Sequence, residues 1–66
     1  MPMVRIELYP GRSPEQKSAC ARDIVAAIAR HLNAPPEATQ VVFVDVARSD
    51  WLLGSQLPPL AAPPGE

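Results

Sequence analysis

A chain of 66 residues forms one small domain, and its single cysteine excludes a disulfide within that domain. The formal net charge is −1, the six basic residues are scattered, and one histidine without clustered ligands offers no structural metal, so nucleic-acid binding and a metal staple have little support. Apolar residues make up 47% of a chain too short to bury more than about 60% of its unfolded surface. Oligomerisation is the remaining means of stabilising it.

The first element is predicted over residues 3–9, where side chains alternate between two faces. Val4, Ile6 and Leu8 share one face, which is the period of a strand packed on a core. Pro10 and the glycine after it end the pattern. No stretch is long enough to cross a bilayer and no signal segment opens the chain, so we expect a cytoplasmic protein that binds no membrane.

A helix is predicted from Pro14 to Leu32. Ser13 is a suitable N-cap, and Gln16 follows at capping-box spacing. Apolar residues then recur at helical intervals, and among them Cys20 is interpreted as core rather than as a nucleophile. Asn33 suits a left-handed C-cap before two prolines that forbid further helix.

Residues 40–46 form a β-branched run that predicts a central strand covered on both faces. Strand, helix and strand make a β-α-β unit of the α/β class, with parallel strands and a single long helix. One helix covers one face only, so the other face must meet another subunit. Residues 49–57 contain a turn around Gly54 and are predicted as a short C-terminal hairpin. The domain therefore spans residues 1–57, and residues 58–66 form a proline-rich tail.

The candidate chemistry begins at the amino terminus. A small residue after Met1 usually allows that methionine to be removed, which would leave Pro2 with a free secondary amine. Burial and a nearby cation would lower the pKa of that amine toward the working pH of a general base. Arg12 is the candidate cation because its planar fork matches a carboxylate. A strand between them separates Pro2 from Arg12 by roughly 25 Å, so a shared site requires two chains.

Three segments, residues 2–6, 11–17 and 32–35, resemble the 4-oxalocrotonate tautomerase family in order and spacing, and the similarity covers roughly residues 2–57. The resemblance implies β-α-β subunits that pair and assemble as trimers of dimers, with sites between subunits and no cofactor or metal. It also implies a small acidic substrate, a 2-hydroxydienoate or 2-oxo acid, with Pro2 as general acid and base. Arg12 matches the arginine that holds the substrate's distal carboxylate.

Two further positions follow from the same resemblance. Trp51 falls where the family places an aromatic wall, usually phenylalanine. Gln40 departs from the pattern, because it stands where the classical tautomerase has a second arginine that binds the substrate. A neutral amide forms no salt bridge, which predicts weaker activity on dicarboxylates or a substrate with one acidic group. Arg48, close to Trp51 in sequence, is a candidate for the missing cation.

Three functions are compatible with these residues. A tautomerase that uses Pro2 is the first. A dehalogenase or hydratase of haloacrylates on the same scaffold is the second, and it needs a carboxylate that activates water and usually paired arginines, so Gln40 argues against it. The third is a non-catalytic assembly subunit, which Gln40 and any retention of Met1 would favour. Homo- and hetero-oligomers both remain open, and a homo-oligomer is preferred.

Overall fold

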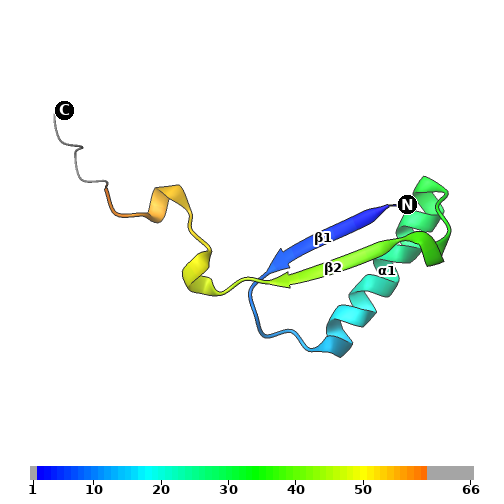
Figure 1. Cartoon of the computed structure of the whole chain (residues 1–66), viewed down its shortest axis with the longest axis horizontal. Helices are drawn as coiled ribbons and strands as arrows, with labels where there is room; N and C mark the ends of the chain where they lie inside the picture. Colours follow the sequence, from blue (N-terminus) through cyan, green and yellow to red (C-terminus); the bar gives the residue numbers. More distant parts are fainter. Residues whose placement is uncertain (1, 60–66) are drawn as a thin grey trace.

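The computed structural model describes residues 2–59, and Met1 and residues 60–66, which hold most of the predicted tail, lie outside the described residues. Two paired strands lie beside one long helix. One short 3₁₀ turn follows the helix, and two more follow the second strand (Figure 1). In chain order the elements are β1 (Met3–Leu8), α1 (Pro14–Leu32), η1 (Pro36–Ala38), β2 (Gln40–Asp45), η2 (Arg48–Asp50) and η3 (Gly54–Gln56). The strands are parallel, which confirms the predicted β-α-β unit.

The two strands pair along their whole length, from Met3 opposite Gln40 to Leu8 opposite Asp45. Each ends one residue earlier than predicted. Tyr9 leaves the ladder because the following proline restricts its backbone and has no N–H to donate. The residue after β2 still donates a backbone hydrogen bond of 2.8 Å to the carbonyl of Leu8, so the strand pairing ends gradually.

Both predicted caps of α1 are present. The hydroxyl of Ser13 accepts from the backbone N–H of Gln16 at 3.1 Å, and the Gln16 side chain accepts from the N–H of Ser13 at 2.8 Å. Asn33 closes the helix in the left-handed region, at φ 55° and ψ 39°. A long-range ion pair of 3.0 Å joins Lys17 in the first turns of α1 to Asp45 at the end of β2. The pair fixes the start of the helix beside the ends of the strands.

The core lies between α1 and one face of the sheet, and it is thin. Its apolar side chains are only half-buried, and no residue among those described is fully buried. The contributing residues are Val4, Ile6 and Leu8 of β1, Val41 and Phe43 of β2, and Ala21, Ile24, Val25 and Ile28 of α1. The prediction that Cys20 belongs to this core is wrong for the single chain, because Cys20 lies exposed at the edge of the helical stripe.

The other face of the sheet is uncovered in a single chain. Met3, at 59% exposure, and Val42 lie there, and so do Arg5 and Glu7, which form an ion pair of 3.3 Å. Because side chains alternate along each strand, all four lie on the face of the sheet that points away from α1. Half of a two-faced sheet therefore stays in solvent, as expected for a chain that completes its core with another subunit.

The segment after β2 runs away from the β-α-β body (Figure 1). The predicted C-terminal hairpin is wrong: residues 48–57 contain the turns η2 and η3 and no strand. Local backbone bonds of 2.8 Å, from Asp50 to Ala47 and from Gln56 to Leu53, take up the groups that a hairpin would pair across its strands. Leucines of this segment are well exposed, with Leu52 at 68%. None of the described helices is long and apolar enough to span a membrane.

Candidate active site

Pro2 stands at the start of the sheet, half-buried, immediately before β1. Its carbonyl accepts a hydrogen bond of 3.0 Å from the backbone N–H of Gln40, the first residue of β2. The structure therefore brings two of the four predicted site residues together. They share the edge at which both parallel strands begin, and the Gln40 residue is exposed there.

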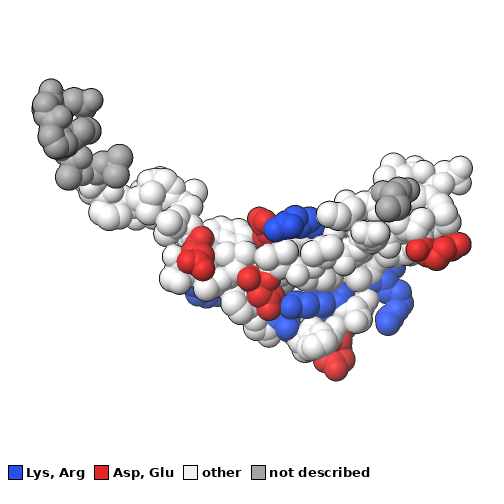
Figure 2. Space-filling view, in the orientation of Figure 1, with Lys and Arg blue, Asp and Glu red and all other residues white. Residues whose placement is uncertain are grey.

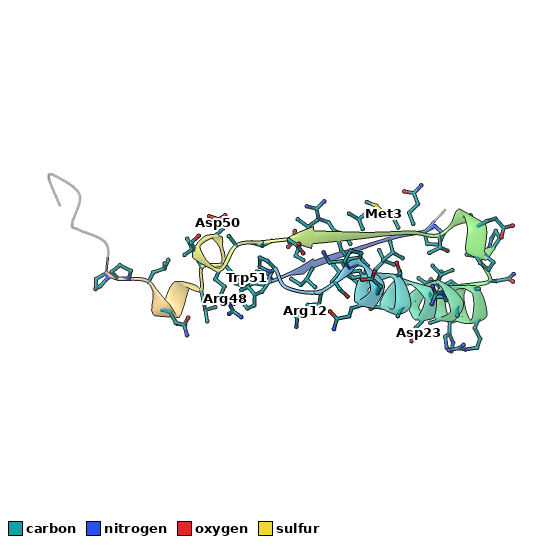
Figure 3. The ribbon with its side chains drawn as sticks, turned by 90° about the horizontal axis from the view of Figure 1, so that it is seen from below. Met3, Arg12, Asp23, Arg48, Asp50 and Trp51 are labelled. Carbon is teal, nitrogen blue, oxygen red and sulfur yellow. The ribbon has the colours of Figure 1, made fainter. Side chains whose placement is uncertain are left out.

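Arg12 and Trp51 occupy the opposite edge, where the strands end. Gly11 turns the chain there with φ 126°, a backbone conformation that glycine adopts without strain, and thereby sets the direction of Arg12. The Arg12 side chain is exposed and forms no ion pair within residues 2–59. Trp51 follows η2 and is 43% exposed. Figure 3 shows both residues away from Met3, toward the far end of the sheet.

The two pairs cannot form one site within a chain. A six-residue strand separates them, which corresponds to about 20 Å at the rise of a strand. Pro2 and Gln40 lie at one end of that strand, and Arg12 and Trp51 at the other. The topology thus reproduces the predicted separation of Pro2 from Arg12.

A cluster that the sequence did not predict lies at the Arg12 end. The rings of Tyr9 and Trp51 have centroids 4.9 Å apart and planes tilted by 55°. The guanidinium carbon of Arg48 lies 4.0 Å from the centroid of the Tyr9 ring. The sequence pattern places Tyr9 at the end of the first strand and predicts no contact for its ring. The available signal was its position: Tyr9 directly follows β1, Trp51 is the first aromatic after β2, and the two strands end side by side because they are parallel.

A hollow open to solvent adjoins this cluster. It encloses about 450 Å³ and is lined by Glu7, Val46, Asp50, Trp51 and Leu52. The mixture of one aromatic wall, two aliphatic residues and two carboxylates suits a small polar molecule with an apolar part. Pro2 does not line it, so the hollow of a single chain lacks the candidate base.

Charges near the site are mixed in sign. Figure 2 shows basic and acidic side chains interspersed over the face in view, without a continuous basic stripe. Within the part of the chain that the structure describes, no three histidine, cysteine, aspartate or glutamate side chains gather into a group that could hold a metal ion. Beside the carboxylates of the hollow, the polar groups at the two ends of the sheet include the cations Arg12 and Arg48 and the amide of Gln40.

Comparisons with known proteins agree with this architecture. A family model described as tautomerase enzyme matches residues 2–58. A probable tautomerase of Lactococcus lactis is 37% identical over 57 residues, which cover 86% of this chain and 93% of the relative. A 2-hydroxymuconate tautomerase of Pseudomonas putida is 35% identical over 57 residues, 86% of this chain and 90% of that protein.

A solved structure extends the similarity to three dimensions. It is a heterohexamer 4-oxalocrotonate tautomerase from Chloroflexus aurantiacus, with a TM-score of 0.74 and 31% identity, covering 88% of this chain and all of the other. The match confirms the resemblance noted in the sequence, because it extends over the whole β-α-β unit. The chain described here belongs to the tautomerase enzyme family.

Proposed function

We propose that this protein is a cofactor-independent tautomerase in which Pro2 is the general acid and base, acting on a small 2-hydroxydienoate or 2-oxo acid. The observation that carries the proposal is the place of Pro2: it is half-buried at the start of the sheet in a chain of the tautomerase family. The names of the curated relatives, which include a 2-hydroxymuconate tautomerase, support the substrate class.

The proposed reaction moves one proton and changes no atom count. With Met1 removed, the nitrogen of Pro2 takes the hydroxyl proton of the enol while a C=O bond forms at that carbon. The same nitrogen then gives the proton to a carbon further along the conjugated system. The secondary amine takes the proton as the free base and returns it as the ammonium ion. One nitrogen serves both steps because apolar walls and a guanidinium lower its pKa toward neutral pH.

Arg12 and Trp51 supply the recognition in this proposal. The guanidinium of Arg12 binds a substrate carboxylate through two parallel N–H donors and draws negative charge away from the reacting carbons. Trp51 forms the apolar wall that excludes water from the amine. Gln40, next to Pro2 through the bond to its carbonyl, donates its side-chain amide to the oxygen at C2 of the substrate.

Assembly is part of the proposal, because Pro2 and Arg12 stand at opposite ends of β1. Two chains packed with their strands antiparallel would place Arg12 and Trp51 of one beside Pro2 of the other. The uncovered face with Met3 and Val42, and the exposed leucines after β2, supply the apolar surface for such packing. We propose a homo-oligomer, a dimer that assembles further as a trimer of dimers.

The test is replacement of the proposed base. Pro2→Ala replaces the secondary amine by a primary amine of different basicity and shape, and we expect kcat/KM for 2-hydroxymuconate to fall by roughly 10²- to 10⁴-fold, the usual contribution of a general base. Intact mass of the parent protein should show that Met1 is absent. Pro59→Ala, at an exposed proline beyond the strands, is the matched control and should behave as the parent. A Pro2→Ala protein as fast as the parent would refute the proposal.

A further inference from the structure

Arg48, Tyr9 and Trp51 form one cluster at the edge where the two strands end. Tyr9 follows β1 directly, Arg48 opens the turn η2 after β2, and Trp51 follows that turn. Arg48 stacks on the Tyr9 ring at 4.0 Å, and that ring contacts Trp51 at 4.9 Å. Figure 3 shows Arg48 and Trp51 together, with Arg12 toward the same end of the molecule. Two cations from one chain thus stand at one edge of the sheet.

Stacking fixes the guanidinium of Arg48 without using its donors. An arginine that lies face-on to an aromatic ring directs its N–H groups sideways, in the plane of the guanidinium. Among residues 2–59, no carboxylate lies within ion-pair distance of Arg48. Arg12 has no such partner in that range either. The edge therefore presents two guanidiniums that are available to anions, and one of them is held in place.

We propose that Arg48 is a second substrate-binding cation, so that Arg12 and Arg48 of one chain together bind a substrate with two acidic groups. The inference rests on the proposed function and names its substrate class: a dicarboxylate rather than a monocarboxylate. Tyr9 is a positioning residue, which orients Arg48 and does not touch the substrate. Trp51, which belongs to the cluster and also lines the hollow, packs against the apolar middle of the substrate in this proposal.

Carboxylates at the hollow oppose anion binding, and Arg48 offsets them. Glu7 is already paired with Arg5 at 3.3 Å. Asp50 has no cationic partner within the described residues, and it stands two residues from Arg48 in the same turn. The unpaired Asp50 charge explains why one arginine at this edge would be insufficient for a doubly charged substrate. Asp50→Asn should therefore strengthen dicarboxylate binding.

The experiment compares substrates with one and two carboxylates. For Arg48→Gln, we expect KM for 2-hydroxymuconate to rise roughly tenfold, the loss of one charge-assisted contact, with kcat nearly unchanged. KM for phenylenolpyruvate, which has one carboxylate, should change by no more than about twofold. Arg48→Lys should recover part of the loss, since the charge returns without the stacked fork. Arg22→Gln removes an exposed charge on α1 and serves as the control.

A purely structural role for Arg48 predicts something else. In that case Arg48→Gln would lower the thermal midpoint or the oligomer mass and would raise KM for both substrates equally, and this result would overturn the inference. Equal KM values for parent and Arg48→Gln on both substrates would overturn it as well.

Binding to the inactive protein separates this inference from the proposed function. Muconate, a dicarboxylate without the reacting hydroxyl, should bind Pro2→Ala protein as well as it binds the parent, and Arg48→Gln should weaken it roughly tenfold. If Pro2→Ala is as fast as the parent but Arg48→Gln still weakens muconate, the function fails and the binding site stands. If muconate binding is unaffected by Arg48→Gln, the inference fails whatever Pro2 does.

Discussion

The two ends of the sheet differ in kind. At the start of the strands stand a half-buried proline and a neutral amide, joined by one backbone hydrogen bond of 3.0 Å. At the other end stand two guanidiniums, a tilted aromatic pair and an open hollow. In the proposed function, one end supplies the group that moves a proton once Met1 is removed, and the other end supplies the groups that bind an anion. Under that proposal neither end is a complete site alone.

Parallel topology imposes this division. In a β-α-β unit both strands start at one edge and end at the other, so residues before and after a strand can never meet within the chain. Antiparallel pairing of two chains joins the unlike ends, and it does so twice in a two-fold dimer. The thin core requires the same step, because no described residue is fully buried in the single chain. The same contact between two chains would then complete both the hydrophobic core and the proposed active site.

Complementation between two inactive chains tests this division with the largest expected effect. Pro2→Ala and Arg12→Ala proteins should each be nearly inactive alone. When the two are co-expressed, a site with Pro2 from one variant and Arg12 from the other is whole. Random mixing should restore about a quarter of the parental activity, since each half-site is intact with even odds. Steady-state rates on 2-hydroxymuconate, at equal total protein, measure the recovery.

The control for complementation is co-expression of Pro2→Ala with Gln40→Ala. Both changes strike the same end of the sheet, so neither chain carries Pro2 together with Gln40 and no whole site can form. The mixture should show only the activity of the sites that contain the Pro2 of Gln40→Ala chains, with no recovery beyond it. If Pro2→Ala with Arg12→Ala stays as inactive as either variant separately, the sites are not shared between chains.

Gly11 lies at the end of the sheet that holds Arg12, away from Pro2. Its φ of 126° is unfavourable for any residue with a β-carbon, although a methyl group there would meet no atom within 4 Å. Gly11→Ala should therefore cost about 1–2 kcal/mol of unfolding free energy through backbone strain alone. It should also raise KM more than it lowers kcat, because Arg12 is displaced and Pro2 is not. Thermal unfolding at fixed protein concentration, with steady-state kinetics, measures both effects.

Gly54 provides the matched comparison. It also has open space around its missing β-carbon, and its φ lies outside the left-handed region. Gly54→Ala should be neutral or stabilising by about 0.4–1 kcal/mol. Equal destabilisation by both substitutions would show that strain at Gly11 is not the cause.

The sequence was most informative where a single local bond decides the structure. Ser13 and Gln16 predicted the start of α1, and Asn33 predicted its end, because caps depend on residues that are three or four positions apart. The alternation from Val4 to Leu8 predicted the face of β1 that meets the helix. The separation of Pro2 from Arg12 also followed from strand length.

Contacts between distant segments were beyond such patterns. The stacking of Arg48 on Tyr9 and the ion pair of Lys17 with Asp45 depend on how the strand ends come together, and nothing in the local sequence marks either. The expected hairpin after β2 failed for a related reason. Residues that look extended take single 3₁₀ turns when no neighbouring strand pairs with them.

The smallest predicted effect compares the caps at the two ends of α1. Ser13→Ala removes the oxygen that accepts from Gln16 at 3.1 Å and should cost about 1 kcal/mol, whereas Ser13→Thr keeps an acceptor and should cost less. Asn33→Gly, at the end near Pro2, should change stability by only a few tenths, because glycine adopts the left-handed cap readily. Thermal unfolding at fixed concentration measures all three. If Ser13→Ala also raises KM and Asn33→Gly does not, substrate binding depends on the helix start beside Arg12, because α1 begins at the Arg12 end of the sheet.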